Sequence, residues 1–460
     1  MQGGYTLSRL CRKKEAILRF HRLSDWLAWQ ETLHPNPVDL GLERVSRVAR
    51  RLEIGRLPFP VLSVAGTNGK GSCVALLESI FSKAGYRVGA YTSPHLLRYN
   101  ERVRVDGHEA SDEALIRAFD AVDRARQTNT EINAQGDTTL TYFEFGTLAA
   151  MVLFRRAEPD VVVLEVGMGG RLDAVNLFDA DVALVTAIGL DHQAWLGHDR
   201  ETIGREKAGI YRPDRPAICA DPAPPASVGD HARSIGAHWY CAGRDFRFSP
   251  DTDGWRWESR FGDSYRNLPE PALAGAHQRQ NAAGVLMAIH SIRDRLPVPE
   301  TALRRGLASV TLPGRFQVIE GKDGITRILD VAHNPQAARA LARLLREHPR
   351  HGRTDGQTDG RTLAVVAMLK DKDMEAVLRA TWAAIDAWYI AGLDGPRGAS
   401  AVMLAAALAR IDTGVPVHTE ATVADAYHAA LRGAEPGDRL VVFGSFHTVG
   451  MVSRIIAEGG

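Results

Sequence analysis

The chain has 460 residues, which is more than one hydrophobic core usually holds, so its length predicts at least two domains. Hydrophobic residues make up 45% and charged residues 24%, proportions typical of a soluble globular protein and not of a disordered one. The formal net charge is +1, so overall charge gives no reason to expect nucleic acid or a membrane surface as a partner. The four cysteines are scattered and no apolar run reaches transmembrane length, which predicts a cytoplasmic protein without a disulfide framework.

The first part of the chain alternates apolar runs with amphipathic segments. Residues 1–25 are charged and are expected to form an extension, and residues 39–54 have the apolar spacing of a helix. Buried strands are expected over residues 59–66, 87–93, 159–167 and 179–188, with a helix over 71–86 between the first two. The alternation predicts an α/β domain with a mostly parallel sheet over residues 1–312, of the P-loop ATPase type.

The later part of the chain begins with an irregular stretch. Between Pro222 and Pro271, tryptophans and Asp-Gly turns predict short antiparallel strands. Beyond "LPG" at residues 312–314, strand-like and helix-like runs alternate again, which predicts a smaller, doubly wound Rossmann-like domain over residues 313–460. The polar, glycine-rich tract at residues 348–362 is expected to be an exposed, mobile loop of this second domain.

The stretch "VAGTNGKGS" connects the first buried strand to the following helix. Glycines allow backbone N–H groups to approach a phosphate closely, the helix N-terminus adds a positive dipole, and a lysine supplies a point charge. In the usual P-loop pattern, Ser or Thr follows the lysine directly, whereas here Gly71 separates Lys70 from Ser72. The candidate phosphate-binding residues are Gly66, Thr67, Asn68, Gly69, Lys70, Gly71 and Ser72.

Polar groups also follow other strands of the first domain. Ser93 follows the second strand, Glu165 lies near the end of a third, and His192 follows a fourth. In open α/β sheets, ligands bind at the carboxyl ends of the strands. We therefore expect these groups to lie at one site together with the glycine-rich loop.

Several longer motifs, in this order along the chain, are typical of one family. They are "VAGTNGKGS", "YTSPHL", "LTYFEFGTLAA", "VVLEVGMGGRLDAVN", "LDHQAWLGHDRETIGREKAGI", "LPGRFQ", "DVAHNP" and "GSFHTV". The sequence resembles the bacterial bifunctional dihydrofolate synthases/folylpolyglutamate synthases of the Mur ligase superfamily from about Trp26 to its last helix. The resemblance implies an ATP-dependent ligase that activates a pterin or folate carboxylate as an acyl phosphate, which the amine of L-glutamate then attacks.

The resemblance also implies roles for single residues. Lys70, His192 and Lys207 would be catalytic, and Mg²⁺, two ions in all, would be held by Ser72, Ser93, Glu165 and His192. Besides the glycine-rich loop, ATP would be contacted by Asn281, Arg315 and Asp330. Lys207 matches the lysine that carries CO₂ as N6-carboxylysine in this superfamily; its charged neighbours are equally typical of an exposed helix surface.

The substrates implied are dihydropteroate, reduced folates, L-glutamate and ATP, bound by a monomer without nucleic acid or membrane. Residues expected at the pterin are Asp39, Leu40, Gly41, Leu42, Thr141, Tyr142, Phe143, Glu144 and Leu172. Residues expected at glutamate are His333, Ser445 and His447, with the loop at residues 368–374 as another candidate. Aromatic residues such as Tyr142 and Phe143 offer flat faces to a pterin, although such residues often serve only the core.

Three alternatives share part of this pattern. A monofunctional folylpolyglutamate synthase is the nearest, and another Mur-type amino-acid ligase would carry an additional domain before Gly66, for which there is little room. A nucleotide-binding protein without ligase chemistry would bind ATP but release no phosphate when given dihydropteroate and glutamate.

Overall fold

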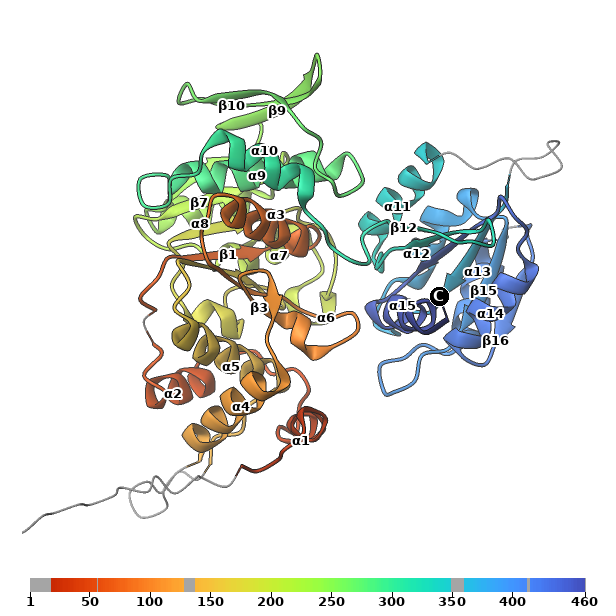
Figure 1. Cartoon of the computed structure of the whole chain (residues 1–460), viewed down its shortest axis with the longest axis horizontal. Coiled ribbons are helices and arrows are strands. Elements are labelled where there is room, and N and C mark those ends of the chain that lie inside the picture. The colour runs from red at the N-terminus through yellow and green to blue at the C-terminus, as the bar shows by residue number, and fades with distance from the viewer. Residues whose placement is uncertain (1–17, 56, 128–136, 349–359, 412–413, 460) are drawn as a thin grey trace, which may run out of the picture.

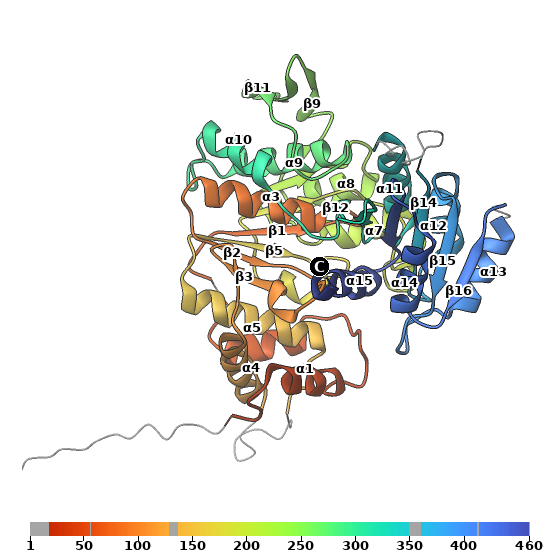
Figure 2. The same cartoon turned by 45° about the vertical axis from the view of Figure 1, so that its right-hand side comes forward.

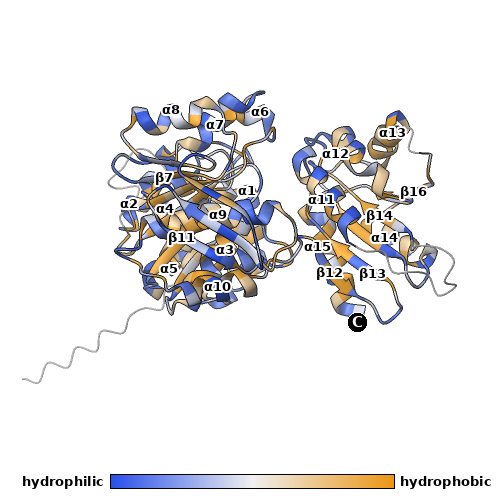
Figure 3. Ribbon diagram, turned by 90° about the horizontal axis from the view of Figure 1, so that it is seen from above, coloured by the Kyte–Doolittle hydropathy of each residue, from blue (hydrophilic) through white to orange (hydrophobic). Residues whose placement is uncertain are grey.

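The computed structural model describes residues 18–55, 57–127, 137–348, 360–411 and 414–459. Two sheets organise the chain into two lobes, joined at residues 310–316 (Figure 1). The strands of both sheets consist mainly of hydrophobic residues, as the hydropathy colouring shows (Figure 3). Of the expected extension, residues 1–17 lie outside the described residues, whereas the first helix already begins at Leu23, and both Leu23 and Trp26 are buried.

The first lobe contains an eight-stranded sheet in the order β4-β3-β2-β5-β1-β6-β7-β8. Strands β2, β5, β1, β6, β7 and β8 run parallel, whereas β3 and β4 form an antiparallel edge. The strands are β1 Val61–Ala65, β2 Val88–Tyr91, β3 Val103–Val105, β4 His108–Glu109, β5 Val161–Glu165, β6 Val182–Val185, β7 Pro216–Cys219 and β8 His238–Cys241. The central strands β1, β5 and β6 are predominantly apolar and buried along their whole length, because helices cover both faces of the sheet.

The covering helices divide between the two faces of this sheet, as Figures 1 and 2 show. One face is covered by α3 and α9, with α10 packed on α3. The other is covered by α5, with α4 packed on α5 and α1 and α2 packed against these two helices. The helices are α1 Leu23–Thr32, α2 Glu43–Arg51, α3 Lys70–Lys83, α4 Asp112–Arg126, α5 Tyr142–Ala157, α6 Gln193–Leu196, α7 Arg200–Ala208, α8 Ala226–Ser234, α9 His277–Ser291 and α10 Glu300–Ser309. The helix expected over residues 39–54 is confirmed as α2, which buries Val45, Val48 and Ala49.

The expected antiparallel strands are confirmed as a separate three-stranded sheet in the order β11-β10-β9. Its strands are β9 Phe246–Asp251, β10 Gly254–Ser259 and β11 Ser264–Leu268. Trp255 and Trp257 alternate along β10 with residues that face solvent, and both tryptophans are fully buried. The small sheet therefore attaches to α9 through an apolar face, at the end of the lobe far from the second sheet (Figure 1).

The second lobe contains a six-stranded sheet in the order β12-β13-β17-β14-β15-β16. Only β12 runs antiparallel to its neighbour, so this is a mixed sheet of Rossmann-like design. The strands are β12 Gln317–Glu320, β13 Thr326–Leu329, β14 Thr362–Val366, β15 Ala387–Ala391, β16 Val417–Glu420 and β17 Arg439–Phe443. The helices are α11 Pro335–Glu347, α12 Met374–Thr381, α13 Ala401–Ile411, α14 Val423–Gly433 and α15 Phe446–Gly459. Most of the expected mobile loop at residues 348–362 lies outside the described residues.

Among the described residues, no helix combines the length and the apolar character needed to cross a membrane.

Candidate active site

The glycine-rich loop lies between β1 and α3, as the sequence predicts. Gly69 adopts a left-handed conformation (φ 94°) immediately before the helix, a conformation that glycine adopts without steric cost. Lys70 begins α3, and its Nζ donates to the carbonyl oxygens of Gly66 and Thr67 at 3.1 and 3.4 Å. The lysine charge is therefore folded over the loop, next to the helix N-terminus, which is the arrangement suited to a phosphate group.

A second loop, after β6, fixes the conformation of the glycine-rich loop. The Thr67 hydroxyl bonds both the carbonyl oxygen and the N–H of Gly189 at 3.0 Å. Thr186 donates from its hydroxyl to the carbonyl oxygen of Asn68 at 2.7 Å. The loop after β6 carries Asp191 and His192, so these contacts hold the two loops in a fixed relationship.

Glu165 ends β5 directly beside the glycine-rich loop. Its Oε2 accepts the backbone N–H of Ser93 at 3.2 Å, which joins two of the residues expected at the metal. Burial raises the pKa of the Glu165 carboxyl, and the nearby charges of Lys70 and Arg315 act in the opposite direction. Burial disfavours the ionised carboxylate, and a bound cation would stabilise it. Carboxylate oxygens are also the ligands that Mg²⁺ prefers.

The donor set at this place is mixed. No three His, Cys, Asp or Glu side chains gather as a metal cluster in the part of the chain that the structure describes. A cation here would therefore also need hydroxyl or phosphate oxygens, as expected from Ser72 and Ser93. Ser72 is buried in the first turn of α3, which is compatible with that arrangement.

Lys207 points into the molecule from α7. It is 4% exposed, and its Nζ donates to the carbonyl oxygen of Gly66 at 3.0 Å, so it shares an acceptor with Lys70. Burial, together with the charge of Lys70, lowers the pKa of Lys207 to about 7. The neighbouring residue Glu206 is on the outer side of α7 and pairs with Arg171 at 2.9 Å. Lys207 is buried, so the alternative of a lysine on the exposed helix surface is wrong.

His192 lies at the start of α6 on the loop after β6. Burial lowers the pKa of its imidazole to about 4, and the charges of Lys372, Lys70 and Lys207 act in the same direction against that of Asp191. Three lysines therefore lie within electrostatic reach of one imidazole. Lys70, Lys207 and His192, expected to act together, share one positively charged environment.

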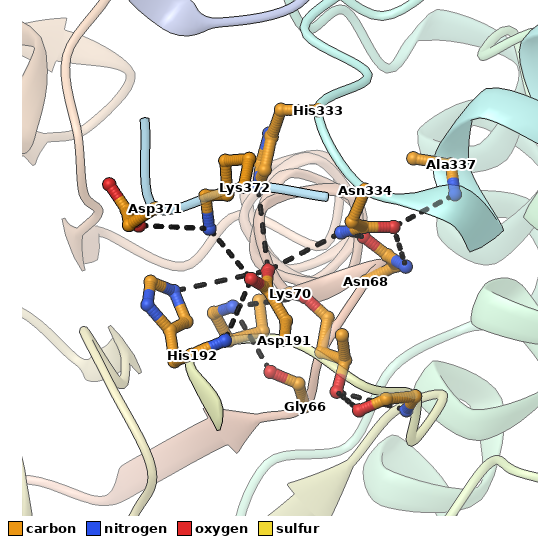
Figure 4. A network of polar contacts seen from close by, with 12 residues as sticks. Gly66, Asn68, Lys70, Asp191, His192, His333, Asn334, Ala337, Asp371 and Lys372 are labelled. Atoms are coloured by element: carbon orange, nitrogen blue, oxygen red, sulfur yellow. Dashed lines mark hydrogen bonds and ion pairs between the residues drawn. The ribbon is translucent and has the colours of Figure 1, made fainter. Parts of the chain in front are cut away.

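Asp191 is the centre of a polar network that also includes the second lobe (Figure 4). Lys372 Nζ lies 2.6 Å from Asp191 Oδ1, and His333 Nε2 lies 3.6 Å from Oδ2. Although burial disfavours the charged carboxyl, its hydrogen bond to His333 and the charges of His192 and Lys372 together hold its pKa well below the usual range. The motif "DVAHNP" is thereby brought to the glycine-rich loop.

Asn68 forms the second link between the lobes. Its Nδ2 donates to Asn334 Oδ1 at 3.1 Å and to Gln336 Oε1 at 2.8 Å, and Asn334 Nδ2 donates back to Asn68 Oδ1 at 2.9 Å. Asn334 also caps α11 by accepting the N–H of Ala337. The first turn of a second-lobe helix is therefore attached to the phosphate loop itself.

Of the three further residues expected at ATP, Asn281 and Arg315 lie against the glycine-rich loop, whereas Asp330 lies beside the connection between the lobes. Asn281, on α9, is buried against Gly69 and donates to Gln278 Oε1 at 2.9 Å. Asp330 accepts the backbone N–H groups of Phe316 and Ala332, each at 2.8 Å, so it fixes the connection between the lobes. The guanidinium of Arg315, on that connection, lies 5.1 Å from the ring centre of Phe446.

Some of the residues expected at the pterin are brought together at the start of α5. Arg44 joins two of them: it lies 3.0 Å from Asp39 Oδ2 and 3.1 Å from Glu144 Oε1. Glu144 and Thr141 form a capping box at the start of α5. Both oxygens of Glu144 are therefore already engaged, and Arg44 is the member of this group that the sequence analysis missed.

The two aromatic residues of this group differ in their surroundings. The Tyr142 ring lies 5.9 Å from that of Tyr99, and the Arg102 guanidinium lies 5.5 Å from its centre. Phe143 packs against Gly167, where a Cβ would come within 2.6 Å of the ring. Leu40, Gly41, Leu42 and Leu172 are all partly exposed, so a ligand can reach this region.

The residues expected at glutamate are only partly brought together. His333 joins the Asp191 network, and its Nδ1 bonds the carbonyl oxygen of Val331 at 2.8 Å. Ser445 is buried and caps the start of α15 through Thr448, and the neighbouring His447 is exposed. The loop at residues 368–374 contributes Lys372, a site residue that the sequence analysis did not single out within that loop.

Comparisons with known proteins define the class first. The Mur ligase middle domain matches residues 64–219, and the glutamate ligase domain of Mur ligases matches residues 314–446. A solved structure of the Escherichia coli protein FolC, in complex with DHPP and ADP, superposes with a TM-score of 0.85 at 45% identity, covering 95% of this chain and 98% of that one. The fold is that of a Mur-type ATP-dependent ligase.

The particular family follows from the curated relatives. The dihydrofolate synthase/folylpolyglutamate synthase of Escherichia coli is 46% identical over 435 residues, which cover 94% of this chain and 95% of the relative. The protein of that name from Haemophilus influenzae is 39% identical over 444 residues, covering 93% and 96%. A bifunctional folylpolyglutamate synthase/dihydrofolate synthase solved with Mn, AMPPNP and L-glutamate bound has a TM-score of 0.84 at 43% identity, covering 95% and 98%. The chain belongs to the dihydrofolate synthase/folylpolyglutamate synthase family.

Proposed function

We propose that this protein joins L-glutamate to dihydropteroate, giving dihydrofolate, and extends reduced folates with γ-linked glutamates, using ATP for each bond. The observation that carries the proposal is the convergence of Lys70, Glu165, Lys207 and the Asp191 network at the junction of the two lobes. Family membership over nearly the whole chain agrees with it. A carboxylate is a poor electrophile, and a site that gathers cations around a phosphate loop is suited to converting it into an acyl phosphate.

In the first half of the reaction, the pterin carboxylate attacks the γ-phosphorus of ATP and ADP leaves. Two anions must meet, so the charge of Lys70 and the N-terminus of α3 would hold the phosphates. Ser72, Ser93, Glu165 and His192 would hold Mg²⁺, which when bound neutralises part of the phosphate charge. Glu165 and Ser93 are already joined, which supports their acting as a unit.

In the second half, the neutral amine of glutamate attacks the acyl carbon. A C–N bond forms, the C–O bond to phosphate breaks, and the amine nitrogen releases a proton. His333 and the neighbouring second-lobe loops would place glutamate, because the Asp191 contacts bring them to the phosphate loop. Closure of the two lobes around ATP, through Asn281, Arg315 and Asp330, would keep water from the acyl phosphate.

Lys207 would act as a carboxylated lysine. Addition of CO₂ requires a neutral amine, and its lowered pKa of about 7 provides one near physiological pH. The carbamate would place an anionic oxygen ligand beside Lys70. The pterin would lie near Tyr142, Phe143 and Arg44, where aromatic faces and a guanidinium are available.

We further propose that the protein acts as a cytoplasmic monomer on small molecules, without nucleic acid or membrane. Residues from both lobes of one chain form the candidate site, so no second copy is needed to complete it. Cys73, Cys219 and Cys241 are free thiols, which fits a reducing compartment.

The test measures glutamate incorporation and phosphate release by the purified protein. Parallel reactions contain MgATP and L-glutamate with either dihydropteroate or tetrahydrofolate as the acceptor. We expect both acceptors to be glutamylated with one phosphate released per bond. Activity with tetrahydrofolate alone would indicate a monofunctional folylpolyglutamate synthase, and ATP binding without phosphate release would contradict ligase activity.

A further inference from the structure

Asp191 and Lys372 form a buried ion pair between the two lobes. Their closest atoms are 2.6 Å apart, and the side chains are only 6% exposed for Lys372 and 9% for Asp191. Asp191 lies on the loop after β6, and Lys372 lies between β14 and α12. A charge removed from water to this extent depends on its partner, because the partner's loss would leave an uncompensated charge in a poorly solvated place.

Two further side chains of the second lobe contact the Asp191 carboxylate. Asn334 Nδ2 donates to Asp191 Oδ2 at 3.4 Å, and His333 Nε2 lies 3.6 Å from that oxygen. Asp191 is therefore contacted by side chains from two loops of the second lobe, one after β13 and one after β14. Figure 4 shows Lys372, His333 and Asn334 approaching Asp191 together from the second-lobe side of the junction.

The charges nearby explain why Asp191 is needed. Lys372 acts electrostatically on His192 in the same direction as Lys70 and Lys207, so three lysine side chains lie around one place, and Lys207 is held close to neutrality there by its pKa of about 7. Like charges repel one another, more strongly where water is excluded. Lys372 can approach the two lysines of the first lobe because Asp191 lies between the lobes and is bound to it.

We propose that Asp191 and Lys372 are positioning residues for the second half of the reaction: their ion pair sets the alignment of the glutamate-bearing loops with the acyl phosphate. This inference rests on the proposed function, in which each lobe holds one of the two reactants. Reaction between groups held on separate bodies is sensitive to misplacement by as little as 1 Å. Phosphoryl transfer from ATP to the pterin takes place at the phosphate loop of the first lobe. The ATP contacts expected outside that lobe, Arg315 and Asp330, lie on or beside the connection between the lobes, so we expect this step to depend less on the pair.

The experiment separates the two halves. Lys372→Met is compared with wild type, with the conservative variant Lys372→Arg, and with Lys322→Met, a control at an exposed lysine of the second lobe, in the turn between β12 and β13. Glutamate-dependent ADP release is measured with saturating dihydropteroate. Reversible phosphoryl transfer is followed without glutamate, as scrambling of oxygen-18 between the bridge and the β-phosphoryl oxygens of ATP.

We expect Lys372→Met to lower kcat for glutamate-dependent ADP release by about 10²-fold, with oxygen-18 scrambling within about threefold of wild type. Lys372→Arg should restore turnover to within about tenfold, since a cation is again present for Asp191. Lys322→Met should behave as wild type. The proposal would be overturned if Lys372→Met lowered glutamate-dependent ADP release and oxygen-18 scrambling by the same factor. Normal or faster turnover of that variant would also overturn it.

A cycle with Asp191→Asn tests whether the two residues act as a pair. We expect the double variant Asp191→Asn/Lys372→Met to lose no more turnover than the worse single variant, because each substitution already removes the same ion pair. Multiplicative losses would mean that the residues act separately, which would overturn the pairing.

The alignment itself is measured without the reaction. Small-angle X-ray scattering of the ligand-free proteins should give a larger radius of gyration for Lys372→Met than for wild type and Lys322→Met. Unchanged dimensions would contradict the positioning role. If wild type releases no ADP with dihydropteroate and glutamate, the proposed function fails, whereas the scattering result still decides whether the ion pair holds the lobes.

Discussion

Asn281 lies directly against Gly69, so that a Cβ built on Gly69 would come within 2.5 Å of Asn281 Oδ1. The two residues are far apart in the sequence and belong to α9 and to the phosphate loop. A side chain at position 69 would displace an amide that is itself held by Gln278. This contact explains why a glycine is required there beyond its left-handed backbone.

Gly69→Ala should therefore lower the free energy of unfolding by more than backbone strain alone would. Overpacking of a buried position typically costs about 1–3 kcal/mol. Gly85→Ala is the matched control, since Gly85 has nearly the same φ (91°, against 94° for Gly69) but open space where the Cβ would lie. Chemical denaturation of both variants measures the difference, and equal losses of unfolding free energy would show that Asn281 does not restrict the position.

The fold was predictable from the sequence where apolar runs alternate with amphipathic ones. The strand expected over residues 159–167 appears as β5, and the helix over 71–86 as α3. The edge strands β3 and β4 escaped prediction because they have only three and two residues, which is too short for a periodic pattern. The start of α1 at Leu23 was missed because its helical pattern is weak, and packing of Trp26 against Phe119 and Phe145 stabilises it.

The candidate site was predictable where a motif follows a strand. Lys70, Glu165 and His192 follow or end neighbouring strands of the first sheet, and the topology brings them together. Lys372 and Arg44 could not be assigned because their roles depend on partners in distant parts of the chain. A sequence pattern shows which residues share a strand end, but not which charge of another lobe will face them.

Lys70→Ala should lower turnover by about 10²–10³-fold, the range for loss of one charge-stabilising group. The lysine lies over the phosphate loop and no other residue of α3 places a charge there. The control is Lys83→Ala, which removes an exposed lysine from the last turn of the same helix. Steady-state phosphate release measures both variants, and near-normal turnover of Lys70→Ala would exclude it from the site.

Tyr142→Ala should raise KM for dihydropteroate more than KM for ATP. Its ring is packed beside Tyr99 and Arg102 at the start of α5, on the side where the pterin is proposed to bind. Loss of one base-like stacking contact costs about 1–3 kcal/mol, which corresponds to a change of five- to 150-fold. Tyr240→Ala, on β8, is the control. If both KM values change by the same factor, the ring has no specific role at the pterin.

Lys207 should make the stability of the protein depend on pH. Its pKa is about 7 in the folded protein and 10.5 in its ordinary state, so between these values only the unfolded chain binds the proton. The free energy of unfolding should therefore rise with pH across this window, by an amount on the order of a few kcal/mol, relative to Lys207→Met. The measurement is denaturation of both proteins in CO₂-free buffer from pH 7 to pH 10. Parallel curves for the two proteins would contradict a neutral, buried amine.

The same lysine should react with CO₂ when bicarbonate is supplied. A neutral amine beside the charge of Lys70 can add CO₂, and the resulting anion would be stabilised by that charge. We expect a carbamate signal in carbon-13 NMR with labelled bicarbonate, absent from Lys207→Ala. That variant should lose most of its activity and regain part of it with formate or acetate, which can place a carboxylate in the vacated space. Full activity of Lys207→Ala, or a carbamate signal that persists in it, would show that the modification is not at Lys207.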